Sequence, residues 1–167
     1  KFDTGMNRLG FNIEDLEELI SVILSQPEVR VEGVFSHLAS SDNSNDDDFS
    51  NSQFIAFEKI TKKLEGAFGY SLIKHMLNTA GIERFKNKQY DMVRLGLGIY
   101  GLSKNKSTLP VLSLKTKISQ IKKINKGDSI GYGTMHKVYK PTKIGIIPIG
   151  YADGLHRNLS NKIDVLI

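Results

Sequence analysis

The sequence predicts an α/β fold followed by a smaller all-β region, and two observations carry this prediction. Over residues 11–93, short apolar segments typical of strands alternate with segments of helical periodicity. Strands that alternate with helices pair in parallel, either in a β/α barrel or in an open doubly wound sheet. Beyond a polar linker at residues 103–110, strand-like runs are joined by glycine-rich turns, and no long helical pattern recurs. We therefore predict two domains, over residues 1–105 and 106–167.

Two helices are predicted in the first domain, over residues 13–24 and 49–68. Their apolar residues recur every three or four positions, which is the spacing of one helix face. Acidic residues occupy the first turn of the earlier helix, where the helix dipole favours them. Asn12 is suited to be its N-cap, and Pro27 prevents its continuation. A shorter helix is expected within residues 81–85.

Strands are predicted between and after these helices. Residues 29–38 are β-branched and apolar, as in a buried strand, and shorter strands are expected at 71–77 and 91–93. Residues 40–48 are too polar for the core and are expected to form a loop. In the second domain, strands are expected within three segments, residues 111–124, 137–148 and 162–167.

Composition bounds the class of protein. The chain has 167 residues, of which 40% are hydrophobic and 25% charged, as in soluble globular proteins. It has no cysteine, which excludes disulfides and thiolate chemistry and fits a cytoplasmic protein. No apolar run approaches the roughly 20 residues that span a bilayer. We expect no membrane partner.

The net charge of +5 reflects a lysine-rich surface rather than a nucleic-acid site. Lys122, Lys123 and Lys126 are not interleaved with aromatic residues, as a nucleic-acid surface would require. No spacing of histidine and acidic residues is typical of a metal site. The chain begins abruptly at Lys1 inside a motif and ends in an apolar run at residues 164–167, so we expect it to be a fragment of a longer protein.

Polar clusters follow four successive predicted strands, the first of which is expected to end in the opening stretch at residues 1–10. Active sites of β/α barrels are built at the C-terminal ends of the strands and from the loops that follow them. Several of the residues are cationic or are hydrogen-bond donors, which predicts a pocket with anionic contents. The clusters contain Asp3 and Arg8, then His37, then Asn78 and Thr79, and finally Arg94.

Two of these clusters suit a phosphate group. The run Asn78-Thr79-Ala80-Gly81 places a hydroxyl and backbone N–H groups at a helix N-terminus. The Leu-Gly-Leu-Gly run at residues 95–98 allows close backbone approach. Neither matches a Walker loop or a dinucleotide fingerprint. Two such loops after adjacent strands resemble the phosphate site of β/α barrels.

Motifs spread over nearly the whole chain resemble the alanine racemase family, enzymes that interconvert L- and D-alanine with pyridoxal 5'-phosphate (PLP). In chain order they are KFDTGMNRLG, VFSH, NTAG, MVRLGLGIYGL, GYGT and IGYADG, beginning at residues 1, 34, 78, 92, 131 and 149. The family fold is a (β/α)8 barrel followed by a β domain. The resemblance therefore implies the second half of such a barrel and the first part of the all-β C-terminal domain.

The resemblance also implies cofactor-binding roles. Arg8 is similar to the arginine that bonds the phenolic oxygen of PLP and lies near substrate, and Lys1 to a lysine whose carbamate orients that arginine. His37 is similar to the histidine beside the cofactor ring. Arg94 is similar to the arginine that faces the pyridine nitrogen. Phosphate contacts are implied for Asn78, Thr79, Gly96 and Leu97, with Thr79 standing where many relatives have serine.

Arg94 is chemically informative in this context. A guanidinium has a pKa above about 12 and does not readily give its proton to a pyridine nitrogen. The ring would stay unprotonated and be a weaker electron sink than one paired with aspartate. A less stabilised carbanion undergoes fewer side reactions, which suits a racemase.

Tyr132 is similar to the base that removes the α proton of L-alanine, acting in the active site of a partner subunit. The resemblance thus implies a head-to-tail homodimer with shared sites. Because the ordinary pKa of tyrosine is about 10, we hypothesise a relay from Tyr132 through His37 to Arg94 that supplies positive charge. Tyr151 and Asp42 resemble residues of the substrate channel. Met135 and His136 stand where the family usually has an aromatic residue.

The implied function is racemisation of L-alanine to D-alanine, which supplies peptidoglycan precursors. The family lysine that forms the Schiff base with PLP is expected upstream of Lys1, so residues 1–167 alone are expected to be inactive. Two alternatives stay open: a serine or broad-specificity racemase, and a non-catalytic PLP-binding barrel. His75, His136 and His156 are interpreted as structural or surface residues.

Overall fold

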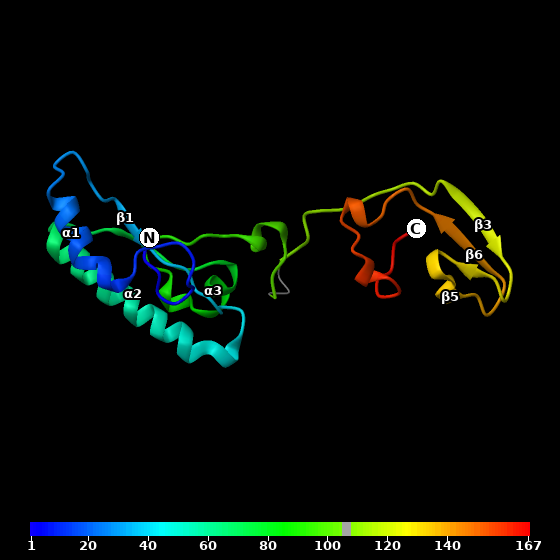
Figure 1. The fold of residues 1–167 in the computed structure, drawn as a ribbon, viewed down its shortest axis with the longest axis horizontal. Coiled ribbons are helices and arrows are strands. Elements are labelled where there is room, and N and C mark those ends of the chain that lie inside the picture. The colour runs from blue at the N-terminus through cyan, green and yellow to red at the C-terminus, as the bar shows by residue number, and fades with distance from the viewer. Residues whose placement is uncertain (105–107) are drawn as a thin grey trace. The chain divides into compact units, whose positions relative to one another are not determined.

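The computed structural model describes residues 1–104 and 108–167. They form two compact units, Lys1–Leu112 and Ser113–Ile167, each of which is described by itself (Figure 1). The domain boundary predicted between residues 105 and 106 lies outside the described residues. No helix in the described part of the chain is both long enough and apolar enough to cross a bilayer.

Parallel strand segments form the centre of the first unit. Strands β1 (Gly33–Phe35) and β2 (Ile73–His75) pair in parallel, with Val34 opposite Lys74. The N–H of Phe2 donates to the carbonyl of Phe35 at 2.9 Å. On the other side, His75 forms a parallel bridge with Met92. The four segments therefore lie side by side in chain order, and the prediction of parallel pairing is confirmed for β1, β2 and the bridge at Met92.

Among the described residues of this unit, three α-helices accompany these strands. A 3-10 turn over Ile13–Asp15 leads into α1 (Leu16–Leu24), and α2 covers Asp47–Phe68. The shorter α3 covers Thr79–Arg84. Helices α1 and α2 lie side by side (Figure 1) and are joined by an ion pair between Glu17 and Lys63. The periodicity of the sequence thus predicted α1 and α2 to within a few residues at the ends, and the short helix expected within residues 81–85 corresponds to α3.

The apolar faces of α1 and α2 close over the strand segments in one core. Burying a large apolar side chain stabilises a fold by about 1.5–3 kcal/mol. The three- and four-residue spacing along α2 directs its apolar residues to the same side. The core residues are Phe2, Leu16, Ile20, Val34, Leu38, Phe54, Phe57, Ile60, Leu64, Leu72, Met76 and Leu77.

The second unit is built from antiparallel strand pairs. Strands β3 (Gln120–Ile124) and β6 (Thr142–Ile146) form one ribbon, and the short strands β4 (Ser129–Ile130) and β5 (His136–Lys137) form another. Two 3-10 turns, Tyr132–Thr134 and Tyr151–Asp153, carry the tyrosines of the predicted site. The antiparallel pairing agrees with the predicted change to β structure.

Several predicted strands are shorter than expected or absent. Residues 29–32 and 111–119 lie outside the strands, and residues 91–93 form only the bridge at Met92. There, the side-chain carboxylate of Asp91 accepts the N–H of Lys74 at 2.8 Å. This N–H is therefore bonded to a side chain and not to a main-chain carbonyl of a neighbouring strand. The strand predicted at residues 162–167 is wrong: this segment is irregular and its apolar side chains are exposed.

Candidate functional site

Arg94 lies at the ends of β1 and β2, where polar groups surround its guanidinium. Its Nη2 donates to the carbonyl oxygens of Ser36 at 2.7 Å and Met76 at 3.2 Å. The same Nη2 lies 2.9 Å from Nδ1 of His37, and Nη1 lies 2.5 Å from Nδ1 of His75. The guanidinium is therefore fixed by two main-chain carbonyls and two imidazoles.

The two imidazoles are electrostatically matched to this arginine. Burial lowers the pKa of His37, and the nearby positive charges of Arg94, Arg8 and Lys1 lower it further. Burial and the charge of Arg94 likewise lower the pKa of His75. Because a guanidinium only donates hydrogen bonds, each Nδ1 must be the acceptor, and the proton of each neutral ring is on Nε2. The Nε2–H of His37 is then a donor that Arg94 does not use.

The opening loop is organised by Asp3. Its carboxylate accepts the backbone N–H groups of Gly5, Met6 and Asn7 at 2.8, 2.9 and 3.1 Å, and that of Arg8 at 2.8 Å. Burial alone would raise the pKa of Asp3, but these four donors prevail and lower it. Asp3 therefore builds the loop that presents Arg8, whose exposed side chain lies close enough to influence His37 electrostatically.

The two loops predicted to suit a phosphate lie together. The hydroxyl oxygen of Thr79 accepts the N–H groups of Gly96 at 3.0 Å and Gly98 at 3.1 Å. A Cβ added to Gly98 would lie 2.7 Å from Cγ2 of Thr79, so this approach requires glycine. The side-chain oxygen of Asn78 caps α3 by accepting the N–H of Gly81 at 2.9 Å.

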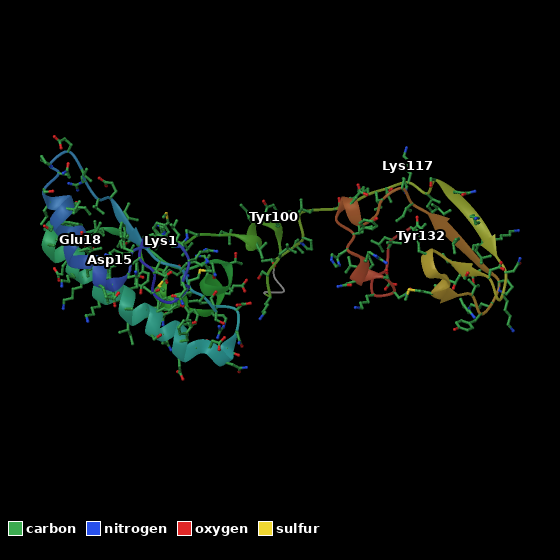
Figure 2. The ribbon with its side chains drawn as sticks, viewed as in Figure 1. Lys1, Asp15, Glu18, Tyr100, Lys117 and Tyr132 are labelled. Atoms are coloured by element: carbon green, nitrogen blue, oxygen red, sulfur yellow. The ribbon has the colours of Figure 1, made fainter. Side chains whose placement is uncertain are left out.

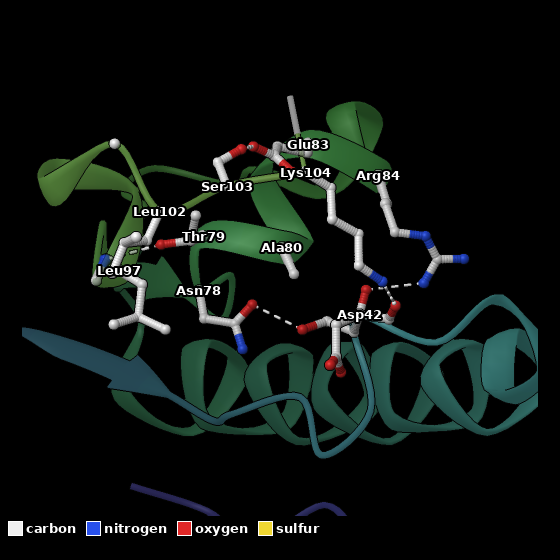
Figure 3. A pocket seen from close by; sticks show the side chains of 13 residues that line it. Asp42, Asn78, Thr79, Ala80, Glu83, Arg84, Leu97, Leu102, Ser103 and Lys104 are labelled. Carbon is white, nitrogen blue, oxygen red and sulfur yellow. Dashed lines mark hydrogen bonds between the residues drawn. The ribbon is translucent and has the colours of Figure 1, made fainter. Parts of the chain in front are cut away.

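A cavity of about 790 Å³ opens beside α3 (Figure 3). Five residues predicted for the site line it, and three others, Arg8, His37 and Arg94, are not among its lining residues. The structure thus brings the predicted residues of the first unit into two groups, one around Arg94 and one around Thr79, which Gly96 connects along the chain. The five lining residues are Asp42, Asn78, Thr79, Gly96 and Leu97.

The tyrosines of the second unit are on its surface. Tyr132 is 99% exposed and Tyr151 is 74% exposed. Figure 2 labels Tyr132 on the second unit. Gly131 and Gly133, on either side of Tyr132, have φ of 77° and 70°, a conformation that favours glycine. The Gly-Tyr-Gly run therefore builds a tight turn that presents the phenol to its surroundings.

Sequence reasoning missed three residues near the site. His75 was interpreted as structural, yet it contacts Arg94; its position at the end of a predicted strand was the available signal. Ser41 was assigned to a loop too polar for the core, yet it is buried and donates to the side-chain oxygen of Asn78 at 2.7 Å. Arg84 donates to the carbonyl of Ser41 at 2.8 Å, a long-range contact without a local signal.

Two family models match the chain. The alanine racemase N-terminal domain matches residues 1–104, and the alanine racemase C-terminal domain matches residues 111–167. The chain belongs to the alanine racemase family. The resemblance found in the sequence motifs is thereby confirmed, and so is the α/β fold followed by a β domain.

Curated relatives agree with this assignment. Alanine racemase 2 of Caldanaerobacter subterraneus is 39% identical over 174 residues, and the alignment covers 100% of this chain and 45% of the relative. The alanine racemase of Syntrophobacter fumaroxidans is 38% identical, with 100% and 46% covered. The chain thus spans a little under half the length of the curated relatives that it matches.

Solved structures show the same fold. An alanine racemase from D-cycloserine-producing Streptomyces lavendulae matches with a TM-score of 0.85 and 27% identity, covering 96% of this chain and 45% of that chain. An alanine racemase from Bacillus anthracis with bound L-Ala-P matches with a TM-score of 0.74 and 31% identity, covering 95% and 43%. Among residues 1–104 and 108–167, no group of three or more histidine and acidic side chains is arranged to hold a metal ion.

Proposed function

We propose that the full-length protein racemises alanine with PLP as its cofactor. The observation that carries this proposal is the setting of Arg94, a guanidinium held between two strand ends by carbonyls and neutral imidazoles. Such a group is a fixed hydrogen-bond donor that keeps its own proton. In a member of the alanine racemase family, this is what the pyridine nitrogen of PLP requires.

The residues of the first unit fit the cofactor. Thr79 keeps its own O–H as a donor, and its oxygen accepts the N–H groups of Gly96 and Gly98, which a bound phosphate would take over. The close approach of Thr79 to this loop requires the glycine at residue 98. Hydroxyl and backbone N–H donors are suited to phosphate oxygens. We assign the phosphate to this region, with Asn78 and Leu97 beside it, and the pyridine nitrogen to Arg94.

Arg8 and Lys1 would complete the cofactor contacts at the other side of the ring. The loop around Asp3 presents Arg8 toward solvent with its main chain fixed by the Asp3 carboxylate. We assign Arg8 to the phenolic oxygen of PLP and to the substrate carboxylate, and Lys1, in carbamate form, to the orientation of Arg8. When bound, PLP supplies the electron sink that makes the α proton of alanine acidic.

Tyr132 of a partner subunit is assigned as the base that takes the α proton of L-alanine. A tyrosine phenol ordinarily keeps its proton at neutral pH, so nearby hydrogen-bond donors must favour the ionised form if it is to act as a base. The Nε2–H of His37 is suited to this role, because Nδ1 of the same ring accepts from Arg94. His37 would donate to the phenolate oxygen and connect it to the positive charge of Arg94. This relay makes a head-to-tail homodimer the working form.

The channel residues and the biological role complete the proposal. Asp42, on the cavity lining, and Tyr151, exposed on the second unit, are assigned to the path by which alanine reaches the site. The match to a C-terminal β domain over residues 111–167 counts against a non-catalytic PLP-binding barrel, which lacks that domain. We assign the enzyme to the cytoplasm, where D-alanine would feed peptidoglycan synthesis.

The test follows α-proton exchange of L-alanine in deuterated water by NMR, using the full-length protein loaded with PLP. We expect D-alanine to form in the wild type, and exchange from L-alanine to fall by about 10²–10⁴-fold in Tyr132→Phe. Tyr139→Phe is the matched control, since Tyr139 is another exposed tyrosine of the second unit. It should keep wild-type exchange.

Two results would overturn parts of the proposal. Normal exchange in Tyr132→Phe would remove this tyrosine from the role of base. A wild-type protein that turns over serine faster than alanine would replace alanine as the substrate and favour the serine or broad-specificity alternative.

A further inference from the structure

The loop after β1 is fastened at Ser41 by both ends of α3. The hydroxyl of Ser41 donates to the side-chain oxygen of Asn78, the cap of the helix, at 2.7 Å. The carbonyl of Ser41 accepts from Nη1 of Arg84, in the last turn of the helix, at 2.8 Å. Figure 3 shows Asn78 and Arg84 on opposite sides of Asp42, the residue that follows. Lys104 adds a third bond, from its Nζ to the carbonyl of Asp42 at 2.7 Å.

Arg84 also reaches the far end of the same loop. Its Nη2 donates to the carboxylate of Asp47, in the first turn of α2, at 2.5 Å. One guanidinium therefore binds the residues at both ends of the segment 41–47. The arginine side chain is only 25% exposed, so solvent screens these contacts less than it would on an open surface. A planar guanidinium donates in two fixed directions at once, which a lysine ammonium does not do.

The segment between these attachment points is compact. Within it, the Asp46 carboxylate accepts from the side-chain nitrogen of Asn43 at 2.8 Å. The same carboxylate accepts from the hydroxyl of Ser40, the residue before the segment, at 2.5 Å. We expect these bonds to make the segment move as a unit when one of its attachments is lost. The position of the segment relative to α3 is then set by its hydrogen bonds to residues outside it. Arg84 makes two of these bonds, to Ser41 and to Asp47.

This arrangement connects the two sides of the cavity. Asp42 and Thr79 both line it, and they belong to the loop and to the first turn of α3, respectively. Helix α3 is six residues long, so Arg84 is little more than one turn from Thr79. The contacts of Thr79 with Gly96 and Gly98 do not involve the loop. Loosening the loop should therefore disturb Asp42 and leave the contacts of Thr79 with Gly96 and Gly98 intact.

We propose that Arg84 is a positioning residue that holds Asp42 at the cavity and thereby determines how tightly the amino-acid substrate is captured. This inference rests on the proposed racemase function and on the place given there to Asp42. Arg84 acts on substrate capture, and it leaves cofactor binding and the proton-transfer step unchanged.

The test uses the full-length holoenzyme and the variant Arg84→Met, which keeps the length of the side chain and removes its donors. We expect KM for L-alanine to rise about tenfold, equivalent to about 1.4 kcal/mol, with kcat and PLP retention within about twofold of wild type. Arg84→Lys, which can restore one of the two bonds, should lie between. Amide hydrogen exchange across residues 41–47 should be faster in Arg84→Met.

A matched control is Lys88→Met, which removes an amine that pairs with Glu58 at 2.7 Å on the same unit but does not line the cavity. It should leave KM and the exchange of residues 41–47 unchanged. In an Asp42→Ala background, Arg84→Met should add nothing further to KM, because coupled residues give non-additive effects.

Three outcomes would overturn the proposal. They are an unchanged KM with unchanged exchange in Arg84→Met, a KM rise that persists in full without Asp42, and a loss of kcat or PLP as large as the rise in KM. Failure of the proposed function is a separate result, namely a wild-type holoenzyme that does not turn over alanine. In that case the amide exchange still tests the attachment of the loop by Arg84.

Discussion

The two units of the chain differ in the size of their buried cores and in how many contacts hold their candidate site residues. All twelve residues of the hydrophobic core cluster belong to Lys1–Leu112, whereas Val138 is the buried apolar residue among the described residues of Ser113–Ile167. The candidate site residues differ between the units in the same way. Arg94 is fixed by four neighbours of its own unit, and Tyr132 is 99% exposed.

This difference shows where each residue obtains its reactivity. In the first unit, burial and hydrogen bonds set the protonation of His37 and the orientation of Arg94. In the second unit, a glycine-flanked turn presents Tyr132 and leaves its environment to the surface that faces it. This exposure suits the proposed role of Tyr132 as a base in an active site that a second subunit completes.

The largest expected effect tests the difference in the cores. Phe57 is 0% exposed and packs edge-on against Tyr90, with ring centroids 5.4 Å apart. Phe57→Ala in the full-length protein should lower the free energy of unfolding by about 3–5 kcal/mol. Ile121→Ala, at a 66% exposed position of β3, should change it by less than about 0.5 kcal/mol. Denaturant unfolding measures both, and equal losses would remove the contrast between the units.

A pH-dependent effect should follow from the imidazoles around Arg94. The pKa values of His37 and His75 are lowered from the ordinary value of 6.5. The unfolded chain therefore binds these protons more readily than the folded one. The stability that the neutral rings contribute is complete above pH 6.5 and is lost as the pH falls through the lowered folded values.

The comparison that isolates this effect replaces both histidines by glutamine, which can still accept a hydrogen bond but does not titrate. As the pH is lowered from about 7 to about 5, the denaturant concentration at which half of the wild-type protein is unfolded should decrease. The decrease should be smaller in the double variant. The range stops there because the lowered pKa values of Asp3, Glu58 and Glu65 add their own losses in more acidic solution. If stability changes with pH in the same way in the wild type and the double variant, the folded protein does not favour the neutral form of the two imidazoles.

The smallest expected effect contrasts two lysines. Lys74 lies 2.8 Å from the carboxylate of Glu65 and is only 25% exposed, so Lys74→Met should destabilise the protein by about 1 kcal/mol. Lys123 on β3 stands directly opposite Lys143 on β6, so Lys123→Met should stabilise it by a few tenths of a kcal/mol. Thermal unfolding of the two variants checks the opposite signs. The same sign for both would contradict the electrostatic contrast between the units.

Local patterns predicted much of the fold. The apolar spacing of α2 and the order of the strand segments follow from period and composition, which a single sequence displays directly. The predicted strand at residues 91–93 is limited to one bridge because Asp91 uses its side chain to bind Lys74. Strand formation there depends on a residue seventeen positions away, which periodicity does not report.

The candidate site shows a similar limit. Strand-end residues such as His37 and Thr79 could be identified because barrels gather such residues at one edge. Ser41 and Arg84, by contrast, meet across forty-three positions, and each taken alone is an ordinary polar residue. The role proposed for Tyr132 comes from the family motif alone, because a tyrosine in an exposed glycine-flanked turn carries no local signal of chemistry.

The most direct test of the central claim measures the protonation of the cofactor's pyridine nitrogen. PLP labelled with ¹⁵N at this position would be bound to the full-length protein, and its chemical shift followed by NMR between about pH 6 and 8. If Arg94, fixed by neutral His37 and His75, is the group that faces this nitrogen, the shift will be that of an unprotonated, hydrogen-bonded nitrogen throughout. A shift typical of a protonated pyridine nitrogen would contradict the account.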